Sequence, residues 1–511
     1  MSRLIMPLCL PAFCALSLCL LAPREAHAEA YWITLARTDN ARTDQEAHRP
    51  LADAHVEAII ATGARLRTRS RWLHALSVNA TTDELESIAR LPFVAAIRPV
   101  GRGMRPLPKA SPLETPPLKL FANENDYGQA WAQLAALGVP AMHDCGLRGE
   151  GVTIAILDTG FNLAHQALAN VSVTAAHDFV NDDDIVRNES GDPSNQHDHG
   201  SLVLALLAGM DAGNFMGVAP KASYLLAKVD DVAEDTPIED DWWVAGLEWA
   251  EREGANVVSS SISFCTSPCD SSQMNGQTEA TSKAAAIAAS KGLWLFNSAG
   301  NTGPGVTTIR APGDAEGVFA VGAVDLAGTI AGNSSRGPTA DGRTKPDLVG
   351  PGVNVLSIDS TSESSYRRYT GTSVATPLVA GVAGLLRQAY PQMSTAELQG
   401  LLRIHASQAD APDNTFGSGL PAGALSTAEY CTASPSDGGA VVDGGTLAKD
   451  GGTVEDDGGA GQRDSGSDGA TPAESSGCQL AAARLGRGGL LPWFLMLVFA
   501  ARRRWLRNSV I

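Results

Sequence analysis

The sequence predicts an α/β protein whose core is a three-layer arrangement, with helices on both faces of a mostly parallel sheet, preceded by a small α+β module. From Gly151 onwards, apolar strand-like runs alternate with helical patterns, which is the order that builds a parallel sheet. Residues 30–100 instead show the order β-α-β-β-α-β, which is typical of a small ferredoxin-like sandwich. A length of 511 residues allows two to four such units.

The N-terminus has the layout of an export signal. Residues 1–28 contain an apolar stretch over positions 4–22, followed by an Ala-His-Ala cleavage motif at 26–28. A membrane anchor is the less favoured alternative, because prolines at positions 7 and 11 interrupt the apolar run. We therefore expect a secreted chain.

The C-terminal segments are also predicted to lie outside the core. Residues 432–477 contain 9 acids, 2 bases and 12 glycines, a composition that predicts a disordered, solvated spacer. Residues 478–511 hold an apolar run of 14 residues followed by three arginines, whereas a bilayer requires about 20. With its preceding Gly-Cys motif, this tail resembles the surface-sorting tags of myxobacteria, which predicts attachment to the cell envelope.

Charge is distributed unevenly along the chain. The net charge of −18 argues against nucleic acid as a partner, because phosphate binding needs a basic face. Residues 29–105 carry 11 bases and 9 acids, whereas residues 106–431 carry 17 bases and 37 acids, so the two segments have complementary fields. Acidic runs at 182–184 and 239–241 could ligate calcium, although such runs more often form solvated faces.

Five cysteines remain if cleavage follows residue 28. In an oxidising compartment, Cys265 and Cys269 in the loop FCTSPCD are the natural disulfide pair, and Cys145, Cys431 and Cys478 have no obvious partner. A zinc site is disfavoured because the Cys-x3-Cys spacing has no second pair nearby.

The carboxylate of Asp158 and the imidazole of His199 lie at positions where catalytic groups are expected. Asp158 ends an apolar strand, the place where α/β sheets put their sites, although an Asp there is more often a turn or a helix cap. His199 opens an apolar helix that would hold a general base rigidly. A metal site formed by His197 and His199 is disfavoured, because no third ligand follows at suitable spacing.

Two further positions suit the stabilisation of negative charge. Asn301 follows a buried strand and the small residues Ala299 and Gly300, so its amide could donate to an oxyanion; a turn Asn is the alternative. Ser373, in the motif GTSVATP, opens a long apolar helix whose unpaired N–H groups favour an anionic intermediate. A simple N-cap would also suit a Ser or Thr there.

Taken together, these motifs resemble the subtilisin-like serine peptidases. The chain order Asp158, His199, Ser373 is that of subtilisin, and no Gly-x-Ser-x-Gly elbow supports an α/β-hydrolase. The serine motif matches the family pattern G-T-S-x-A-x-P in full, and His-Gly-Ser at 199–201 replaces the usual His-Gly-Thr. The resemblance covers roughly residues 126–428 and includes further landmarks at 334–338, 345–347 and 351–352.

This resemblance implies a site and a mechanism that requires no cofactor. Ser373 is the expected nucleophile, His199 the general base and Asp158 the residue that orients it, with Asn301 in the oxyanion hole. Residues 261–263 stand where the family has a strand that pairs with extended substrate, and glycines are usual at 263 and 264. The expected substrate-binding residues are Ser261, Ile262, Ser263, Ala299 and Gly300.

The resemblance also implies a domain order. Residues 29–105 are the expected propeptide, and a Pro-rich connector over 106–127, whose prolines should break regular structure, leads to a catalytic domain at 128–431. We expect a secreted serine endopeptidase, made as a zymogen, that cleaves proteins or peptides and binds its own propeptide. The alternatives are a catalytically inactive subtilisin-fold surface-binding protein and a metal hydrolase built on His197 and His199.

Overall fold

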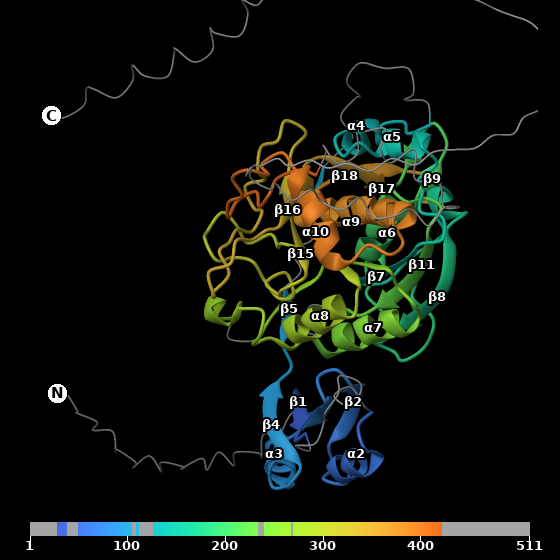
Figure 1. Cartoon of the computed structure of the whole chain (residues 1–511). Helices are drawn as coiled ribbons and strands as arrows, with labels where there is room; N and C mark the ends of the chain where they lie inside the picture. The colour runs from blue at the N-terminus through green and yellow to red at the C-terminus, as the bar shows by residue number, and fades with distance from the viewer. Residues whose placement is uncertain are drawn as a thin grey trace, which may run out of the picture. The chain divides into compact units, whose positions relative to one another are not determined.

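The computed structural model describes residues 28–37, 50–104, 109–111, 126–233, 240–266 and 269–421 (Figure 1). The expected signal peptide, spacer and sorting tail, and most of the connector, lie outside the described residues. Within the described ranges, no helix is both long and apolar enough to cross a membrane.

The N-terminal module has the predicted order β-α-β-β-α-β. Its four strands form one antiparallel sheet in the order β2-β3-β1-β4, and its two helices pack on one face of that sheet through Val56, Ile59 and Ile88. A capping box starts the second helix, because Thr81 and Glu84 each accept a hydrogen bond from the other's backbone N–H. The elements are β1 (Glu29–Leu35), α2 (Asp53–Ile60), β2 (Arg65–Ser70), β3 (Ala75–Ala80), α3 (Thr82–Ala89) and β4 (Val94–Pro99).

A parallel sheet of seven strands forms the centre of the second module. The strand order is β16-β15-β14-β12-β7-β11-β8, and every neighbouring pair is parallel. The inner strands are apolar along most of their length, as expected for strands that are covered on both faces. The strands are β7 (Thr153–Asp158), β8 (Ser172–Asp178), β11 (Ser223–Lys228), β12 (Val257–Ser260), β14 (Trp294–Ser298), β15 (Phe319–Val324) and β16 (Leu348–Pro351).

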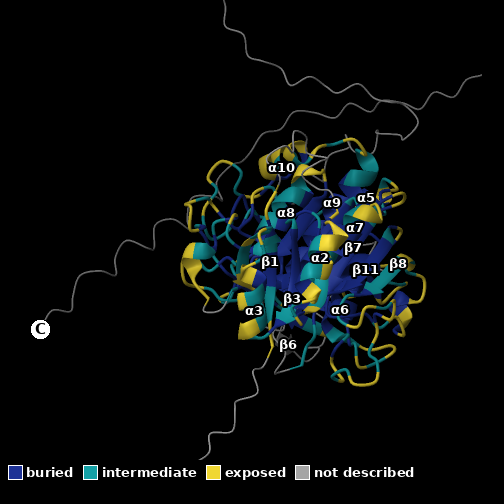
Figure 2. Cartoon of the chain, turned by 90° about the horizontal axis from the view of Figure 1, so that it is seen from below, coloured by how far each residue is buried: buried dark blue, intermediate teal, exposed yellow. Residues whose placement is uncertain are grey.

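Helices cover both faces of this sheet, which confirms the predicted three-layer fold. Strand β7 shows the two cores: Ile154 and Ile156 pack with α6 (Asp198–Ala208) and α9 (Thr372–Ala389). The alternate residues Ala155 and Leu157 pack with α7 (Asp240–Arg252) and α8 (Ala280–Ser290) on the opposite face. Figure 2 shows the resulting buried central sheet beneath partly exposed helices.

Shorter elements surround these layers and complete the described chain. They are β5 (Arg102–Met104), β6 (Lys109–Ser111), α4 (Trp131–Ala135), α5 (Val139–Asp144), η1 (Gln166–Leu168), β9 (Met210–Asp211), β10 (Phe215–Met216), β13 (Ser263–Cys265), η2 (Ser271–Gln273), β17 (Val355–Ile358), β18 (Tyr366–Thr370) and α10 (Thr395–Ile404).

The expectation that the Pro-rich connector lacks regular structure is wrong at β6. This strand lies inside the range 106–127 and pairs antiparallel with β18, and β5 just before it pairs antiparallel with β13. The reason is tertiary: an edge strand offers unpaired N–H and C=O groups to any extended segment that reaches it. Residues 109–111 contain no proline, so each of them has a backbone N–H to donate.

The disulfide predicted in the FCTSPCD loop is present. Cys265 and Cys269 are bonded, with their Cα atoms 5.3 Å apart. Cys145, which the sequence left without an obvious partner, is also disulfide-bonded.

Stacked phenylalanines on adjacent strands lead to a prediction about stability. The rings of Phe296 in β14 and Phe319 in β15 are 4.5 Å apart between centroids, and both residues are at most 1% exposed. Phe296→Ala should lower the free energy of unfolding by about 3–5 kcal/mol, because it leaves a cavity. Urea unfolding in a chain that also carries Ser373→Ala measures this. Val306→Ala, at a 77% exposed position, should change the free energy of unfolding by less than about 0.5 kcal/mol. An equal loss of stability in Phe296→Ala and Val306→Ala would contradict the prediction.

Candidate active site

The carboxyl ends of three adjacent strands meet at one edge of the central sheet. β7 ends at Asp158, β12 at Ser260 and β14 at Ser298. The chain places β11 and β8 on one side of β7 and β12 and β14 on the other, so the winding of the sheet reverses between β7 and β12. Doubly wound sheets bind their ligands outside the strand ends at such a reversal.

Asp158 and His199 form a buried hydrogen-bonded pair at this edge. The distance between His199 Nδ1 and Asp158 Oδ1 is 2.6 Å, and the side chains are 2% and 0% exposed. The backbone N–H of Thr159 also donates to Asp158 Oδ1, at 2.8 Å. Because Nδ1 donates to the carboxylate, a neutral His199 keeps its lone pair on Nε2.

His199 Nε2 is placed to accept a proton. This atom is buried and has no hydrogen-bond partner among the residues that the structure describes, and the same is true of Asp158 Oδ2. A buried polar atom without a hydrogen-bond partner lowers the stability of the folded state. At this strand edge, the unpartnered Nε2 is free to accept a proton from a neighbouring donor.

The start of α6 is held tightly against the loop that follows β7. A Cβ atom on Gly200 would lie 2.1 Å from the carbonyl oxygen of Gly160, so only glycine allows this approach. Gln196, just before the helix, donates to the carbonyl oxygen of Thr159 at 2.6 Å. These contacts fix His199 relative to Asp158.

Asn301 and Ser261 both contact the start of α9, where Ser373 lies. The backbone N–H and the hydroxyl of Thr372 donate to Asn301 Oδ1 at 2.9 and 3.1 Å. Ser261 Oγ donates to the carbonyl oxygen of Ser373 at 3.0 Å. The amide oxygen of Asn301 is thereby fixed toward Thr372, so its amide nitrogen, the donor, points away from Thr372. Sequence reasoning missed Thr372, whose signal was its place beside Ser373.

Ser261 also connects Ser373 to the Asp158 pair. The parallel register of β12 with β7 matches Ser260 to Leu157, so Ser261 and Asp158 are the next residues on adjacent strands. The hydrogen bonds link Asp158 to His199 and Ser261 to Ser373, across positions more than 200 residues apart at the extremes. Among the described residues, no hydrogen bond joins Ser373 to His199 Nε2. Ser373 is 3% exposed at the first turn of its helix, with the positive end of the helix dipole beneath it.

The predicted substrate-binding residues surround these groups. Ser263 begins β13, which pairs with β5, and Ile262 and Ala299 are fully buried. Gly300 has φ of +103°, and a Cβ atom there would lie 2.9 Å from Ser335 Oγ. The backbone conformation therefore favours glycine at position 300.

His197 lies apart from the Asp158–His199 pair. Its Nδ1 accepts from the backbone N–H of Asn188 at 3.1 Å, and its backbone N–H donates to the side chain of the same Asn. It therefore fixes the loop before α6. Within the described ranges, the clustered side chains suited to a metal are Asp178, Asp183 and Glu189 instead.

That acidic cluster includes one residue of the 182–184 run. One ligand atom from each of Asp178, Asp183 and Glu189 lies within 4.8 Å of the others. The buried Lys228 forms an ion pair with Asp178 at 2.8 Å, so one carboxylate already has a cationic partner. Calcium binding here stays an expectation.

The acids at 240 and 241 are buried against the N-terminal module, so the expectation of a solvated face is wrong for them. Trp32 Nε1 donates to Asp240 Oδ1 at 2.7 Å, and Arg67 Nε donates to Asp241 Oδ2 at 2.8 Å. The two aspartates are 1% and 0% exposed. They begin α7, and this end of the helix faces the sheet of the module; Glu239 lies outside the described residues.

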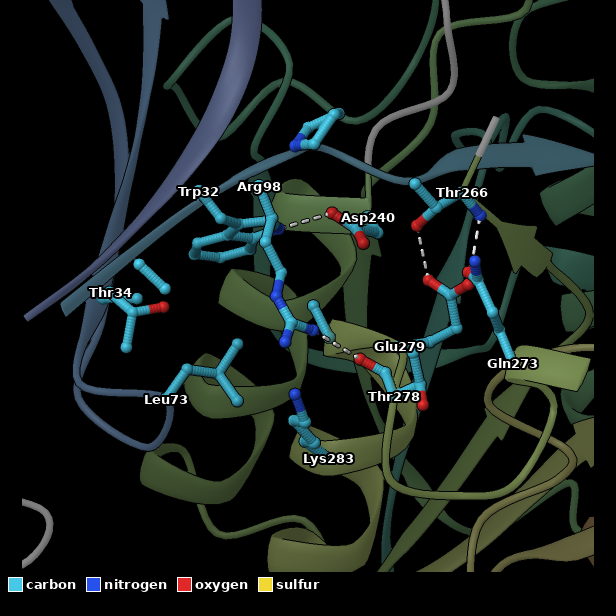
Figure 3. A pocket seen from close by; sticks show the side chains of 14 residues that line it. Trp32, Thr34, Leu73, Arg98, Asp240, Thr266, Gln273, Thr278, Glu279 and Lys283 are labelled. Carbon is cyan, nitrogen blue, oxygen red and sulfur yellow. Dashed lines mark hydrogen bonds between the residues drawn. The ribbon is translucent and has the colours of Figure 1, made fainter. Parts of the chain in front are cut away.

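A cavity of about 500 Å³ lies between the module and the starts of α7 and α8 (Figure 3). Its wall includes Trp32 and Arg98 from the module and Asp240, Glu279 and Lys283 from the core. Burial raises the pKa of Asp240 well above its ordinary value, and the neighbouring Asp241 raises it further. Burial likewise raises the pKa of Glu248, farther along α7, which accepts from Ser70 Oγ of the module.

Comparisons with known proteins agree with this architecture. Residues 149–419 match the Subtilase family, Peptidase S8, and residues 35–112 match the Peptidase S8 propeptide domain of Bacteroidota. The serine protease AprX of Bacillus subtilis is 31% identical over 303 residues, covering 53% of this chain and 65% of that protein. Subtilisin Savinase of Lederbergia lenta is 31% identical over 290 residues, covering 56% of this chain and 94% of that protein.

A solved structure shows the same fold. Fervidolysin from Fervidobacterium pennivorans, described as a keratinolytic enzyme related to subtilisin, superposes with a TM-score of 0.58 at 22% identity. The match covers 79% of this chain and 62% of that structure. Given the matched family profile and relatives, the chain belongs to the subtilase family of serine peptidases. Its N-terminal module is a propeptide domain of that family.

The buried carboxylates beneath the propeptide domain predict a pH dependence. Because burial raises the pKa of Asp240 and Glu248, association takes up protons. The contribution is fully present below about pH 4, the ordinary carboxyl pKa, and is lost as the pH rises through the raised values. Once the connector is cut, the propeptide domain should therefore co-elute with the core on size exclusion more completely at acid pH.

Asp240→Asn should weaken this pH dependence, because the substituted amide does not titrate. Asp53→Asn, at a side chain 81% exposed on the propeptide domain, is the matched control and should leave it unchanged. Identical elution profiles for the wild type and Asp240→Asn from pH 4 to pH 8, which spans about four units upward from the ordinary carboxyl pKa, would contradict the assignment.

Proposed function

We propose that this protein is a secreted serine endopeptidase that hydrolyses peptide bonds through Asp158, His199 and Ser373 and is made as a zymogen. The observation that carries the proposal is the buried 2.6 Å hydrogen bond between Asp158 and His199 Nδ1, together with a His199 Nε2 that has no partner among the described residues. Ser373 supplies the hydroxyl group, at a helix start that Ser261 links to the same strand ends. No cofactor is needed for this chemistry.

The reaction follows from these positions. His199 Nε2 takes the proton of the Ser373 hydroxyl as its oxygen attacks the scissile carbonyl, and Asp158 stabilises the imidazolium that forms. His199 then gives the proton to the leaving amine, which releases one product and leaves an acyl-enzyme. Water attacks this ester with the same proton transfers and restores Ser373.

Negative charge on the tetrahedral intermediate requires donors that are in place before the reaction. Asn301 Nδ2 and the backbone N–H of Ser373 are the proposed oxyanion donors. Thr372 supports this role, because its two hydrogen bonds to Asn301 Oδ1 orient the amide without using its donor. The dipole of α9 adds to the same stabilisation.

Extended substrate is proposed to pair with β13. The support is β5, which pairs antiparallel with this strand in the register Met104 to Ser263, Gly103 to Phe264 and Arg102 to Cys265. The propeptide thus holds a peptide segment on the strand that we assign to substrate. This occupancy would keep the zymogen inactive until the connector is cut between about residues 105 and 127.

Export and attachment to the cell surface are also proposals. They are supported by the signal-like residues 1–28 and the sorting-like tail at 478–511, which lie outside the described residues. Structural calcium at Asp178, Asp183 and Glu189 is proposed on the geometry of that cluster. The alternative of an inactive surface-binding protein is disfavoured, because all four catalytic positions carry the residues that the chemistry requires.

The nucleophile is tested by removing its hydroxyl. Ser373→Ala should abolish both labelling by a fluorophosphonate and loss of the propeptide, measured by mass spectrometry of the purified full chain. Casein hydrolysis should fall to the background. Ser364→Ala, an exposed serine, is the matched control and should label and mature normally. A Ser373→Ala chain that still matures in isolation and cleaves casein would disprove the triad, and inhibition by chelators alone would favour a metal hydrolase.

The oxyanion donor is tested separately. Asn301→Ala should lower kcat by about 10²- to 10³-fold with little change in KM, because the lost donor acts in the transition state. Steady-state kinetics on a peptide substrate, normalised to active sites titrated with fluorophosphonate, measure this. Asn195→Ala, at an exposed position before α6, should leave kcat unchanged. A change confined to KM would assign Asn301 to ground-state binding instead.

A further inference from the structure

Arg310 is a half-buried cation that the proposed mechanism does not use. Its Nε atom is buried and has no hydrogen-bond partner among the described residues. Burial lowers the pKa of its guanidinium group, and no neighbouring carboxylate contributes to that shift. The contact of its Nη1 is the sulfur of Cys265, at 3.7 Å, which is a weak acceptor. A guanidinium so placed lacks the anion that such groups usually bind.

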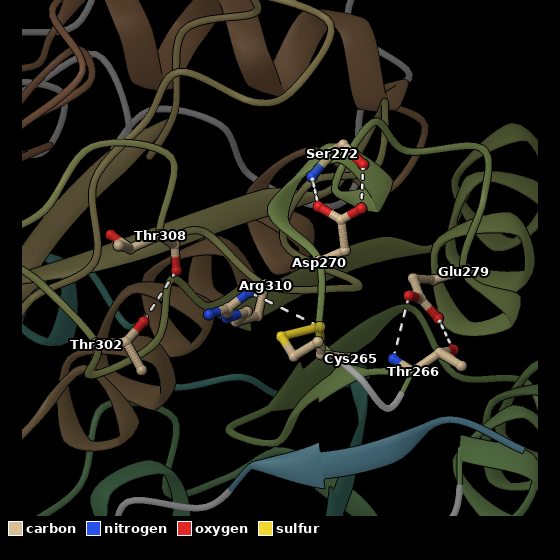
Figure 4. Close-up of a disulfide and its surroundings, with 9 residues drawn as sticks. Cys265, Thr266, Asp270, Ser272, Glu279, Thr302, Thr308 and Arg310 are labelled. Atoms are coloured by element: carbon tan, nitrogen blue, oxygen red, sulfur yellow. Dashed lines mark hydrogen bonds between the residues drawn. A yellow bond between two sulfur atoms is a disulfide. The ribbon is translucent and has the colours of Figure 1, made fainter.

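Its position relates Arg310 to the proposed substrate strand. The next residue, Ala311, accepts a hydrogen bond of 2.7 Å from the backbone N–H of Phe264 in β13. Figure 4 shows the Arg310 side chain beside the Cys265–Cys269 disulfide, whose Cys265 is the last residue of that strand, with Thr302 and Thr308 nearby. The arginine therefore lies against the strand that pairs with extended peptide.

Arg310 also lies beside the proposed oxyanion donor. A Cβ atom built on Gly300 would be 3.9 Å from Arg310 Cγ, and Gly300 directly precedes Asn301. In the residue whose carbonyl is attacked, the side chain is attached to the Cα atom that is bonded to the carbonyl carbon. When Asn301 holds the carbonyl oxygen and the backbone pairs with β13, this side chain is expected on the Gly300 side of the carbonyl group, where Arg310 lies.

We propose that Arg310 binds the carboxylate of the substrate residue whose carbonyl is attacked, which makes the enzyme selective for bonds that follow a glutamate or an aspartate. This inference rests on the proposed function and adds its substrate class. A carboxylate can accept two parallel N–H bonds from a guanidinium, which satisfies Nε and one Nη together. Glutamate, with the longer side chain, is the better match because Arg310 approaches Gly300 through its Cγ rather than its charged end.

The connector lacks this preferred side chain where it leaves β5. The four residues between β5 and β6 are Arg-Pro-Leu-Pro, and the first acidic residue after β5 is Glu114. The segment that pairs with β13 in the zymogen thus brings no carboxylate of its own to Arg310. This agrees with a propeptide that occupies the strand as an inhibitor.

Peptides that differ in one residue test the proposal. The matured enzyme, titrated with fluorophosphonate, is assayed on peptides with Glu, Gln, Leu or Lys before the scissile bond. We expect kcat/KM for Glu to exceed that for the isosteric Gln by about 10- to 100-fold, the range for hydrogen bonds to a charged group. Arg310→Ala should remove most of this ratio, and Arg310→Glu should shift the preference toward Lys.

Arg387→Ala is the matched control. This half-buried arginine also has its pKa lowered by burial, but it stacks on Trp294 at the far end of α9, about 20 Å along the helix from Ser373. In Arg387→Ala, the ratio of kcat/KM for the Glu peptide to kcat/KM for the Gln peptide should equal that of the wild type. A wild-type ratio near one, or the same ratio in Arg310→Ala, would overturn the assignment while leaving the serine peptidase intact. Absence of both fluorophosphonate labelling and peptide hydrolysis would overturn the proposed function and this inference together.

Discussion

The arrangement of the whole site depends on the reversal in the winding of one parallel sheet between β7 and β12. At this point Asp158 and Ser261 become neighbours on adjacent strands, although about 100 residues separate them. α6 then covers β7 and brings His199 to Asp158, and α9 begins where Ser261 can donate to the Ser373 carbonyl oxygen. Parallel strands end at a common edge, so residues from distant segments meet there without any local sequence signal.

The buried acid of the proposed active site and the buried acids at the start of α7 have partners from different domains. Asp158 is balanced within the catalytic domain, by the imidazole of His199 and the backbone N–H of Thr159. At the start of α7, Asp241 pairs with Arg67 of the propeptide domain, whereas Asp240, whose pKa is raised by burial, accepts from the neutral indole of Trp32. The propeptide domain therefore covers three acids of α7, Asp240, Asp241 and Glu248. The Arg67–Asp241 pair agrees with the complementary charges of the two segments.

Arg310 is a half-buried cation whose charge is not balanced by a carboxylate of the described residues. Its guanidinium is half buried beside β13 without a carboxylate of the described chain, whereas Lys228 and Arg67 are buried with theirs. A cation left without a partner at a strand that pairs with peptide is best explained by an anion that the peptide brings. In this proposal, the residues at the strand ends carry out peptide hydrolysis. The loop that contains Arg310 determines which substrate residue is preferred before the scissile bond.

The sequence alone determined the class of fold, the order of elements in the propeptide domain and the positions suited to catalysis. These features have local causes: apolar periodicity, the Thr81 capping box and the motif around Ser373 are each contained in a few residues. Only the tertiary structure decided that β6 would form within a Pro-rich connector, that Asp240 and Asp241 would be buried, and that Thr372 would orient Asn301. Each of these depends on a partner more than 50 residues away, which no local pattern specifies.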